Sequence, residues 1–188
     1  MSAVGASSDQ TPGPGAREAL GVIHGRFQPF HNGHLEYLRL ARGQARQLVV
    51  GITNPEGDAS AQGQGVEARF AAEANPYSYW ERFQMVEAVL ADESSSYARV
   101  IPFPIDEPDR LSAYLPPGAT HYLRVFDEWG NTKVQRLHDA GHSVVVLEPG
   151  AQKQISGADV RTMIADGGPW EELVPAGTAR ILRELGLA

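Results

Sequence analysis

The sequence has 188 residues, no cysteine and a formal net charge of −7 at pH 7. The absence of cysteine excludes thiol catalysis, disulfide bonds and cysteine-based metal sites, and the negative charge argues against a nucleic-acid partner, which would require a basic face. The lack of cysteine also fits a cytoplasmic protein, and a small anionic substrate stays compatible with the net charge. No stretch approaches the ~20 apolar residues of a membrane span, so we expect no membrane partner.

The beginning of the chain differs in composition from the rest. Residues 1–19 are rich in Ser, Gly, Ala and Pro and contain no long apolar run. They also lack the basic start and apolar middle of a signal peptide. We therefore expect residues 1–19 to form a disordered tail, and residues 20–188 to form a single domain of ordinary size.

The remainder of the chain alternates between strand and helix patterns. The first elements are a buried strand at 20–24, a helix from about 33 to 45 and a buried strand at 47–53, and short connections between them indicate parallel strands. Further strands are expected at 99–103, 121–125 and 143–147, and further helices at 79–91, 132–140, 157–165 and 176–187. The order predicts an α/β fold, a doubly wound, Rossmann-like open parallel sheet of about five strands with helices on both faces.

The connection between residues 54 and 75 is unusually long. Its first half is polar and glycine-rich, and residues 66–74 have the composition of a short helix. Loops of this length within a compact domain are usually functional or disordered. The Gly63-x-Gly65 pair does not directly follow a strand, so it is no dinucleotide-binding fingerprint.

The most informative stretch runs from Gly25 to His34, with the sequence Gly-Arg-Phe-Gln-Pro-Phe-His-Asn-Gly-His. It joins the first strand to the first helix. Glycines allow the backbone to approach a ligand, and His31 and His34 stand beside the positive end of a helix dipole, which favours a phosphate. A zinc pair would need a spacing of four and a third ligand, so we predict no metal bound by protein side chains. No P-loop motif is present.

This stretch resembles the His-x-Gly-His signature of a nucleotidyltransferase superfamily, and in its longer form it is similar to archaeal-type nicotinamide mononucleotide (NMN) adenylyltransferases. The segment 155–161, Ile-Ser-Gly-Ala-Asp-Val-Arg, resembles the second signature of that superfamily, Ile-Ser-Gly-x-x-x-Arg. Segments 75–82 and 170–175 are also similar to those enzymes. The resemblance spans roughly residues 21–185.

The resemblance implies in-line attack of an acceptor oxygen on the α-phosphorus of a nucleoside triphosphate, with release of pyrophosphate. Catalysis would rest on positioning and charge stabilisation, with Mg²⁺ carried by the phosphates. It implies three catalytic residues, which are His31, His34 and Arg161. It implies nucleotide-binding roles for Gly25, Arg26, Phe27, Gly33, Ser156 and Gly157.

The acceptor side departs from the adenylyltransferases. An ungapped register places Ser112 where those enzymes carry an aromatic residue that stacks on nicotinamide, and the 54–75 connection is longer. The segment 52–55, Ile-Thr-Asn-Pro, and the longer connection with Arg69 and Asn75 resemble cytidylyltransferases of phosphonate natural-product pathways, which implies CTP and a small phosphonate such as phosphonoformate. The residues expected to bind this anionic acceptor are Arg26, Arg69, Asn75, Arg82, Arg110 and Arg124.

Several alternatives remain open from the sequence. The chain could be an ATP-dependent NMN adenylyltransferase of NAD biosynthesis, or a nucleotide-sensing module without turnover. Arg82 could instead pair with the neighbours of Glu81 or with solvent, and the remaining histidines, among them His24 and His121, are interpreted as structural. Neither the base nor the oligomeric state is fixed by the residues, although relatives of this class are often homo-oligomers.

Overall fold

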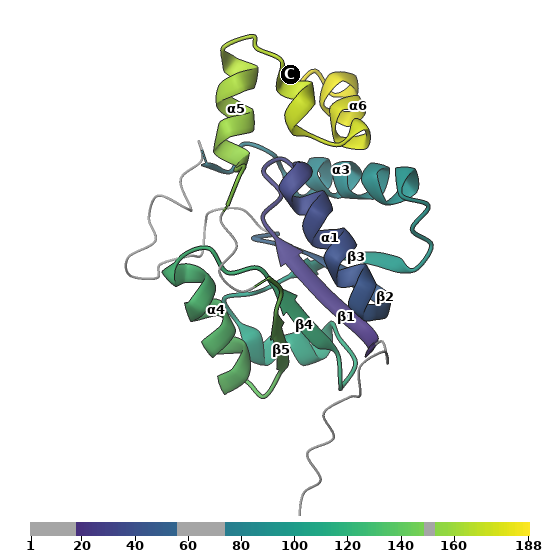
Figure 1. Cartoon of the computed structure of the whole chain (residues 1–188), viewed down its shortest axis with the longest axis vertical. Coiled ribbons are helices and arrows are strands. Elements are labelled where there is room, and N and C mark those ends of the chain that lie inside the picture. Colours follow the sequence, from purple (N-terminus) through teal and green to yellow (C-terminus); the bar gives the residue numbers. More distant parts are fainter. Residues whose placement is uncertain (1–17, 56–73, 149–152) are drawn as a thin grey trace, which may run out of the picture.

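The computed structural model describes residues 18–55, 74–148 and 153–188. Arg69 lies outside these ranges, as do nearly all of the predicted helix at 66–74 and nearly all of the predicted N-terminal tail. Five strands form one parallel sheet in the order β3-β2-β1-β4-β5. This arrangement confirms the predicted doubly wound sheet, and the strand order changes direction at the neighbouring strands β1 and β4 (Figure 1).

The strands lie close to their predicted positions. They are β1 (Glu18–Gly25), β2 (Ala45–Thr53), β3 (Ala98–Phe103), β4 (Thr120–Leu123) and β5 (Ser143–Val146). The helices are α1 (Asn32–Gln44), α3 (Tyr79–Asp92), α4 (Glu128–Asp139), α5 (Gly157–Ala165) and α6 (Ala176–Glu184), with short 3₁₀ helices η2 (Pro108–Ala113) and η3 (Trp170–Leu173). Helix α4 starts four residues before its predicted start because Asp127 caps it by accepting a hydrogen bond from the Gly130 amide. This earlier start brings the first turn of α4 to the end of β4.

Helices cover both faces of the sheet, and successive strand residues supply the two cores. Ile23 and Val50 pack into the core under α1 and α3, whereas their neighbours Val22 and Val49 pack into the core under η2 and α4. Such alternation follows from the two-residue period of a strand. Figure 1 shows α4 on the opposite side of the sheet from α1 and α3.

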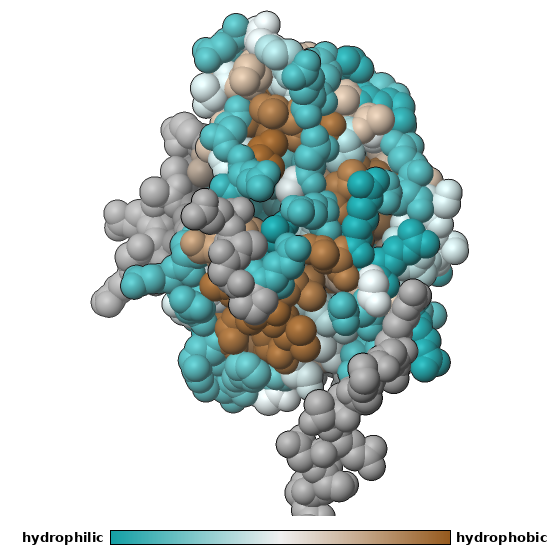
Figure 2. Space-filling model, viewed as in Figure 1, coloured by the Kyte–Doolittle hydropathy of each residue, from teal (hydrophilic) through white to brown (hydrophobic). Residues whose placement is uncertain are grey.

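The surface follows the same division of apolar and polar residues. On the face shown in Figure 2, apolar residues gather toward the middle of the molecule and the periphery is mainly hydrophilic.

Helix α6 packs on α3 with Gly177 at the closest point, where an added Cβ would lie 2.7 Å from the Ala88 carbonyl carbon. Among the described residues, no helix is both long and apolar enough to cross a membrane.

Candidate active site

A cavity of about 470 Å³ opens at the carboxyl ends of the strands. It lies over β1 and β4, where the strand order reverses, which is the usual ligand position in open α/β sheets. Its walls come from the β1–α1 turn, the ends of β2 and β3, the segment from β4 into α4, and the segment leading into α5. The two predicted signature motifs therefore meet in one cavity, although more than a hundred residues separate them.

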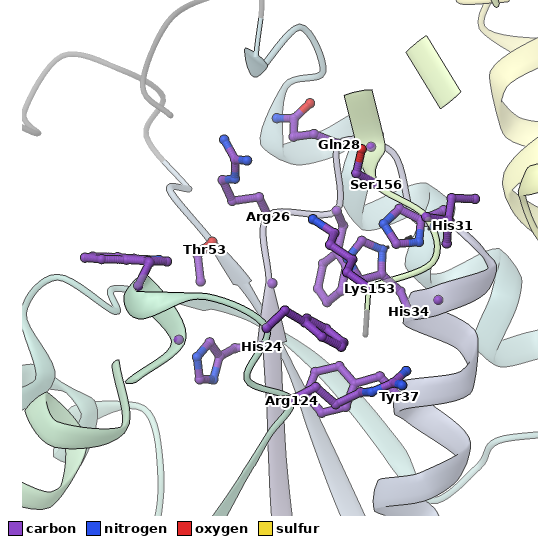
Figure 3. A pocket seen from close by; sticks show the side chains of 18 of the residues that line it. His24, Arg26, Gln28, His31, His34, Tyr37, Thr53, Arg124, Lys153 and Ser156 are labelled. Carbon is purple, nitrogen blue, oxygen red and sulfur yellow. Dashed lines mark hydrogen bonds between the residues drawn. The ribbon is translucent and has the colours of Figure 1, made fainter. Parts of the chain in front are cut away.

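His31 and His34 form a stacked pair at the start of α1. Their ring centroids are 3.7 Å apart and the rings are inclined by 21°. The backbone amide of His31, the residue that caps α1, donates to Nδ1 of His34 at 3.2 Å. Because Nδ1 accepts this bond, the proton of a neutral His34 ring is on Nε2. Figure 3 shows both rings beside Lys153 and Ser156, on one side of the end of β1.

Both rings favour the neutral form in the absence of a ligand. Burial lowers the pKa of His31 from 6.5 to about 4, and the positive charge of Lys153 adds to this effect. Burial also lowers the pKa of His34 well below its usual value, followed by the influence of His31 and of Lys153. If both stacked imidazoles were protonated, their two positive charges would repel each other at short range. Near neutral pH the pair thus presents N–H donors rather than two cations.

Two glycines allow the signature motifs to approach one another. A Cβ on Gly33 would lie 3.0 Å from Ile155 Cγ2, and a Cβ on Gly157 would lie 2.3 Å from the Gln28 carbonyl oxygen. The second distance is far shorter than any real contact. Gly157 is the first residue of α5, so any larger residue there would push α5 away from the β1–α1 turn.

Arg161 connects α5 to the same turn. Its Nη1 donates to the Gln28 carbonyl oxygen at 2.5 Å, and its partial burial lowers the pKa of the guanidinium. Ser156 caps α5 by accepting from the Asp159 amide at 3.2 Å. The start of α5 therefore places Ser156, Arg161 and the first backbone amides of the helix on the cavity wall.

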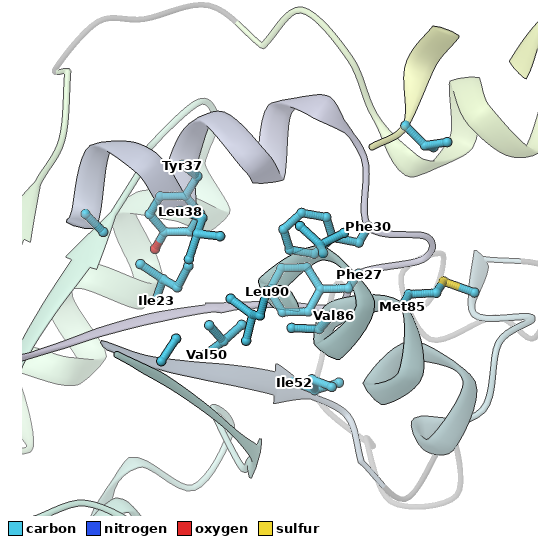
Figure 4. Packing of buried hydrophobic residues seen from close by; sticks show 14 of the residues in the cluster. Ile23, Phe27, Phe30, Tyr37, Leu38, Val50, Ile52, Met85, Val86 and Leu90 are labelled. Atoms are coloured by element: carbon cyan, nitrogen blue, oxygen red, sulfur yellow. The ribbon is translucent and has the colours of Figure 1, made fainter. Parts of the chain in front are cut away.

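The turn itself rests on the core. The Gln28 side chain donates to the Tyr77 carbonyl oxygen at 2.9 Å and accepts from the Tyr77 amide at 3.0 Å. Phe27 and Phe30 are each 1% exposed, and Figure 4 shows them packed near Val86 of α3. Phe27 was predicted to bind nucleotide. It borders the cavity, but its ring chiefly packs in the core and against the edge of His34.

Arg26 and Arg124, two of the predicted acceptor residues, line the cavity. Arg26 Nη1 donates to Asn75 Oδ1 at 3.3 Å. Asn75 is not part of the lining, so it acts on the cavity through Arg26. Arg124 Nη1 donates to Glu36 Oε2 at 2.5 Å, and its Nη2 lies 3.1 Å from a carboxylate oxygen of Glu148. The Arg124 charge is therefore shared between two carboxylates.

Arg82 does not occupy the predicted position in the acceptor pocket. It is 2% exposed and donates to the carbonyl oxygens of Arg26, Thr53 and Asn54 at 2.7–2.9 Å. Its guanidinium thus satisfies carbonyl groups where β1 and β2 end. This placement differs from the sequence alternative for Arg82 as well, because among the described residues the guanidinium is neither ion-paired nor exposed but donates to backbone carbonyl groups within the fold.

Arg110 also lies away from the cavity lining. It is exposed on η2 and donates to Glu107 at 2.9 Å. Of the arginines predicted to bind the acceptor, Arg82 and Arg110 are thus not part of the cavity lining, because a sequence shows which residues are cationic but not which way their side chains point. Arg69 belongs to the residues that the structure does not describe.

Several lining residues were not singled out by the sequence analysis, among them two lysines and two aromatic residues. Lys153, two residues before the second signature, and Lys133 on α4 add positive charge to the cavity. Phe126 and Trp129 add aromatic surface from the segment that leads from β4 into α4. Their position after a strand's carboxyl end was the available signal.

The described residues contain no group of three or more acidic, histidine or cysteine side chains arranged to hold a metal ion. The acidic residues of the cavity have other contacts. Glu36 pairs with Arg124, Asp106 pairs with Arg136, and Asp127 caps α4. The cavity is therefore suited to an anionic ligand that could bring its own cation.

Comparison with known proteins agrees with this geometry. Residues 22–163, which include both signature motifs, match the family model described as cytidylyltransferase-like. The chain belongs to the cytidylyltransferase-like family. The relatives of this chain include a cytidylyltransferase and an adenylyltransferase, which are both nucleotidyltransferases. This confirms the enzyme class that the sequence resemblance implied.

Two named relatives of this cytidylyltransferase-like protein represent different activities. A phosphonoformate cytidylyltransferase from Streptomyces viridochromogenes is 43% identical over 169 residues, covering 89% of this chain and 92% of the relative. A nicotinamide-nucleotide adenylyltransferase from Thermococcus onnurineus is 31% identical, covering 88% of this chain and 82% of the relative.

A solved structure shows the same fold. It is a bifunctional NMN adenylyltransferase/ADP ribose pyrophosphatase from Francisella tularensis, with a TM-score of 0.59 and 16% identity. The match covers 80% of this cytidylyltransferase-like chain but only 43% of the solved protein. At this identity the likeness concerns the fold alone.

Proposed function

We propose that this protein transfers CMP from CTP to a small phosphonate acceptor such as phosphonoformate, releasing pyrophosphate. The observation that carries the proposal is the 43% identity to a phosphonoformate cytidylyltransferase over nearly the full length of both chains. The cavity supports it because it combines phosphate-binding donors with several cationic side chains. The relative's activity supports CTP and phosphonoformate, the substrates that the sequence resemblance also implies.

In the proposed reaction, a phosphonate oxygen of the acceptor attacks the α-phosphorus of CTP, and the bond between that phosphorus and the bridging oxygen to the β-phosphate breaks. The electron pair leaves with pyrophosphate, so no covalent intermediate on the protein is required. His31 and His34 would stabilise the α-phosphate with N–H donors. As negative charge accumulates beside the rings, it raises their pKa values and strengthens these hydrogen bonds.

The leaving group would be held by the second signature. Arg161 has one N–H committed to Gln28 and can direct others at the β- and γ-phosphates. Ser156 and the amides at the start of α5 supply further donors. Lys153 adds charge near His31, as its effect on the pKa of that ring indicates. Together these groups stabilise charge where it develops on the leaving pyrophosphate.

Mg²⁺ would enter with the triphosphate. The cavity offers few carboxylates that lack other contacts, which fits an ion held mainly by phosphate oxygens and water. When bound, Mg²⁺ supplies charge neutralisation on the phosphates. The side chains that orient the same phosphates remain those of the two signatures.

The acceptor would lie on the other side of the α-phosphate, toward Arg26 and the ends of β2 and β3. The Arg26 side chain donates a hydrogen bond to Asn75, and the Arg26 carbonyl oxygen accepts one from Arg82. Arg124 is an expected contact that would have to share its charge with Glu36 and Glu148. The role of Arg69 in this region stays a prediction.

ATP-dependent NMN adenylyl transfer is the second candidate. It is favoured by the 31% identity to a nicotinamide-nucleotide adenylyltransferase and by the aromatic rings of Phe126 and Trp129 in the cavity. Such rings could stack on a nicotinamide as well as on a nucleobase. This function has less support, because the identity to the adenylyltransferase is lower than that to the cytidylyltransferase.

A matrix of substrates tests the two functions directly. Pyrophosphate release would be measured with each of the four common nucleoside triphosphates against phosphonoformate, methylphosphonate, phosphate and NMN, in the presence of Mg²⁺. Highest kcat/KM with CTP and phosphonoformate is the expected result. Turnover only with ATP and NMN would reject the proposed function, and a lack of turnover in every combination would favour a nucleotide-binding module.

A further inference from the structure

A third histidine borders the cavity, on the other side of β1 from the stacked pair. His24 is 5% exposed, and neither ring nitrogen has a hydrogen-bond partner among the described residues. Figure 3 shows it separated from His31 and His34 by the end of β1. Buried polar atoms in native proteins are nearly always hydrogen-bonded, so two unpartnered nitrogens at a cavity wall suggest that a ligand completes the site.

The strand pattern makes a histidine unexpected at this place. Residue 24 lies on the same face of β1 as Val22, which packs in the core under α4. An aliphatic side chain would continue that core without orphan nitrogens. His121 is also buried with two unpartnered nitrogens, but it is not part of the cavity lining. Of these two histidines, His24 is therefore the one that borders the cavity and can meet a ligand.

The His24 ring is held in a fixed orientation. It stacks on Phe103 with centroids 4.7 Å apart and an inclination of 8°. Phe103 can lie there because Gly51 has no side chain, since a Cβ on Gly51 would stand 2.5 Å from the Phe103 ring. A preorganised ring loses little freedom on binding, as expected for a side chain that recognises a ligand.

Lys133 brings positive charge to the same region. It lines the cavity from α4, one helical turn after Trp129. After burial, Lys133 is the largest influence that lowers the pKa of His24, and it also affects that of His34. Its ammonium group therefore lies within electrostatic range of both histidines.

Resting on the proposed function, we propose that His24 and Lys133 form an anion subsite that binds the carboxylate of the acceptor. The phosphonate of a phosphonoformate-like acceptor must face the α-phosphorus beside His31 and His34, and its carboxylate then needs donors of its own. Lys133 supplies charge and His24 an N–H donor. An acceptor without a carboxylate leaves His24 unpartnered, which makes the subsite a determinant of specificity.

The test compares phosphonoformate with methylphosphonate, which lacks the carboxylate. Dissociation constants would be measured by calorimetry in the presence of a non-hydrolysable CTP analogue, alongside KM values for CTP and acceptor. The variants are Lys133→Met, His24→Asn and the control Gln135→Met, an exposed residue on α4. Thermal unfolding checks that each variant folds, and because Lys133 is only partly buried, its variant keeps the test valid if His24→Asn is unstable.

The expected result is that Lys133→Met weakens phosphonoformate binding about tenfold or more. Methylphosphonate binding and the KM for CTP should stay within about twofold of wild type, and Gln135→Met should match wild type throughout. Equal losses for both acceptors, or no loss for phosphonoformate, would overturn the subsite.

Failure of the proposed function gives a different pattern. If the wild-type chain binds phosphonoformate but releases no pyrophosphate from CTP, the proposed reaction is rejected, and the binding ratios of the variants still decide the subsite. If the wild-type chain does not bind phosphonoformate, the subsite is rejected even if CTP is turned over with another acceptor.

Discussion

Arg161 Nη1 lies 2.5 Å from the carbonyl oxygen of Gln28, so one hydrogen bond joins the two signature motifs. Gln28 in turn holds Tyr77 through both atoms of its side-chain amide. The guanidinium is therefore fixed before any phosphate arrives. A preorganised donor stabilises developing charge without reorganisation at the moment of reaction.

Replacing Arg161 by Lys should lower kcat/KM by about 100-fold, because an ammonium group carries its donors on a single nitrogen and lacks the planar fork with which a guanidinium reaches Gln28 and two phosphate oxygens. Steady-state kinetics of pyrophosphate release would measure this loss. The control is Arg183→Lys on the surface of α6, where the arginine pairs with Glu171, and its kinetics should be those of wild type. A wild-type kcat/KM in Arg161→Lys would remove this arginine from the active site.

His34→Ala should lower kcat by about 10²–10³-fold, since it removes an N–H donor at the reacting phosphate. The dissociation constant for the nucleoside triphosphate should change far less, because the remaining phosphate contacts persist. Single-turnover kinetics and calorimetric titration separate the two effects. His34→Asn, which keeps an acceptor for the His31 amide, should fold like wild type and remain equally slow. An affinity loss as large as the rate loss would indicate a binding role only.

Gly157→Ala should disrupt the site through geometry rather than chemistry. The added Cβ would stand 2.3 Å from the Gln28 carbonyl oxygen, so α5 and Arg161 must shift away from the turn. We expect a fall in kcat/KM of at least about tenfold. Gly43→Ala on α1 is the matched control, because nothing lies within 4 Å of its added Cβ and alanine favours a helix by up to about 1 kcal/mol.

Arg82 should matter for folding rather than for acceptor affinity. Arg82→Met leaves three carbonyl groups at the ends of β1 and β2 without their donor, and we expect a loss of about 3 kcal/mol in the free energy of unfolding. Chemical denaturation would measure it. Arg110→Ala, on the exposed surface, should change stability by less than about 0.5 kcal/mol. Comparable values for the two variants would contradict the structural role.

Acid should destabilise the fold through its buried histidines. The pKa values of His31 and His121 are each lowered from 6.5 to about 4 by burial, so below pH 6.5 the unfolded chain binds more protons than the folded one. The free energy of unfolding is therefore unaffected by the titration of these two groups above about pH 6.5, and it decreases as the pH falls from there toward 4. At pH 5 each costs about 2 kcal/mol.

Thermal unfolding at pH 7.5 and pH 5 checks this dependence. His121→Asn should show a smaller loss of stability between the two pH values than wild type, because one of the groups that protonates on unfolding is gone. The exposed His138→Asn variant should keep the wild-type difference. An unchanged difference in His121→Asn would refute the assignment.

The local patterns predicted the fold well because each strand and helix had a clear signal. The Ser156 cap placed the start of α5 correctly, and alternation of apolar and β-branched residues placed all five strands within two residues. The start of α4 was predicted four residues late because its cap, Asp127, is followed by Glu128 and Trp129, which do not continue an apolar stripe. The hydrogen bond that Asp127 accepts from the Gly130 amide marks that start.

The sequence by itself determined the family and the phosphate-binding motifs, because the residue types and spacings of a tight strand-to-helix turn are local properties of the chain. Only the tertiary structure decided which cations reach the cavity. It directs Arg82 into backbone carbonyls and Arg110 to the surface, and it brings Lys133, Lys153 and His24 to the cavity wall. A side chain's role depends on the direction in which folding points it, and that direction is set by contacts between segments far apart in the chain.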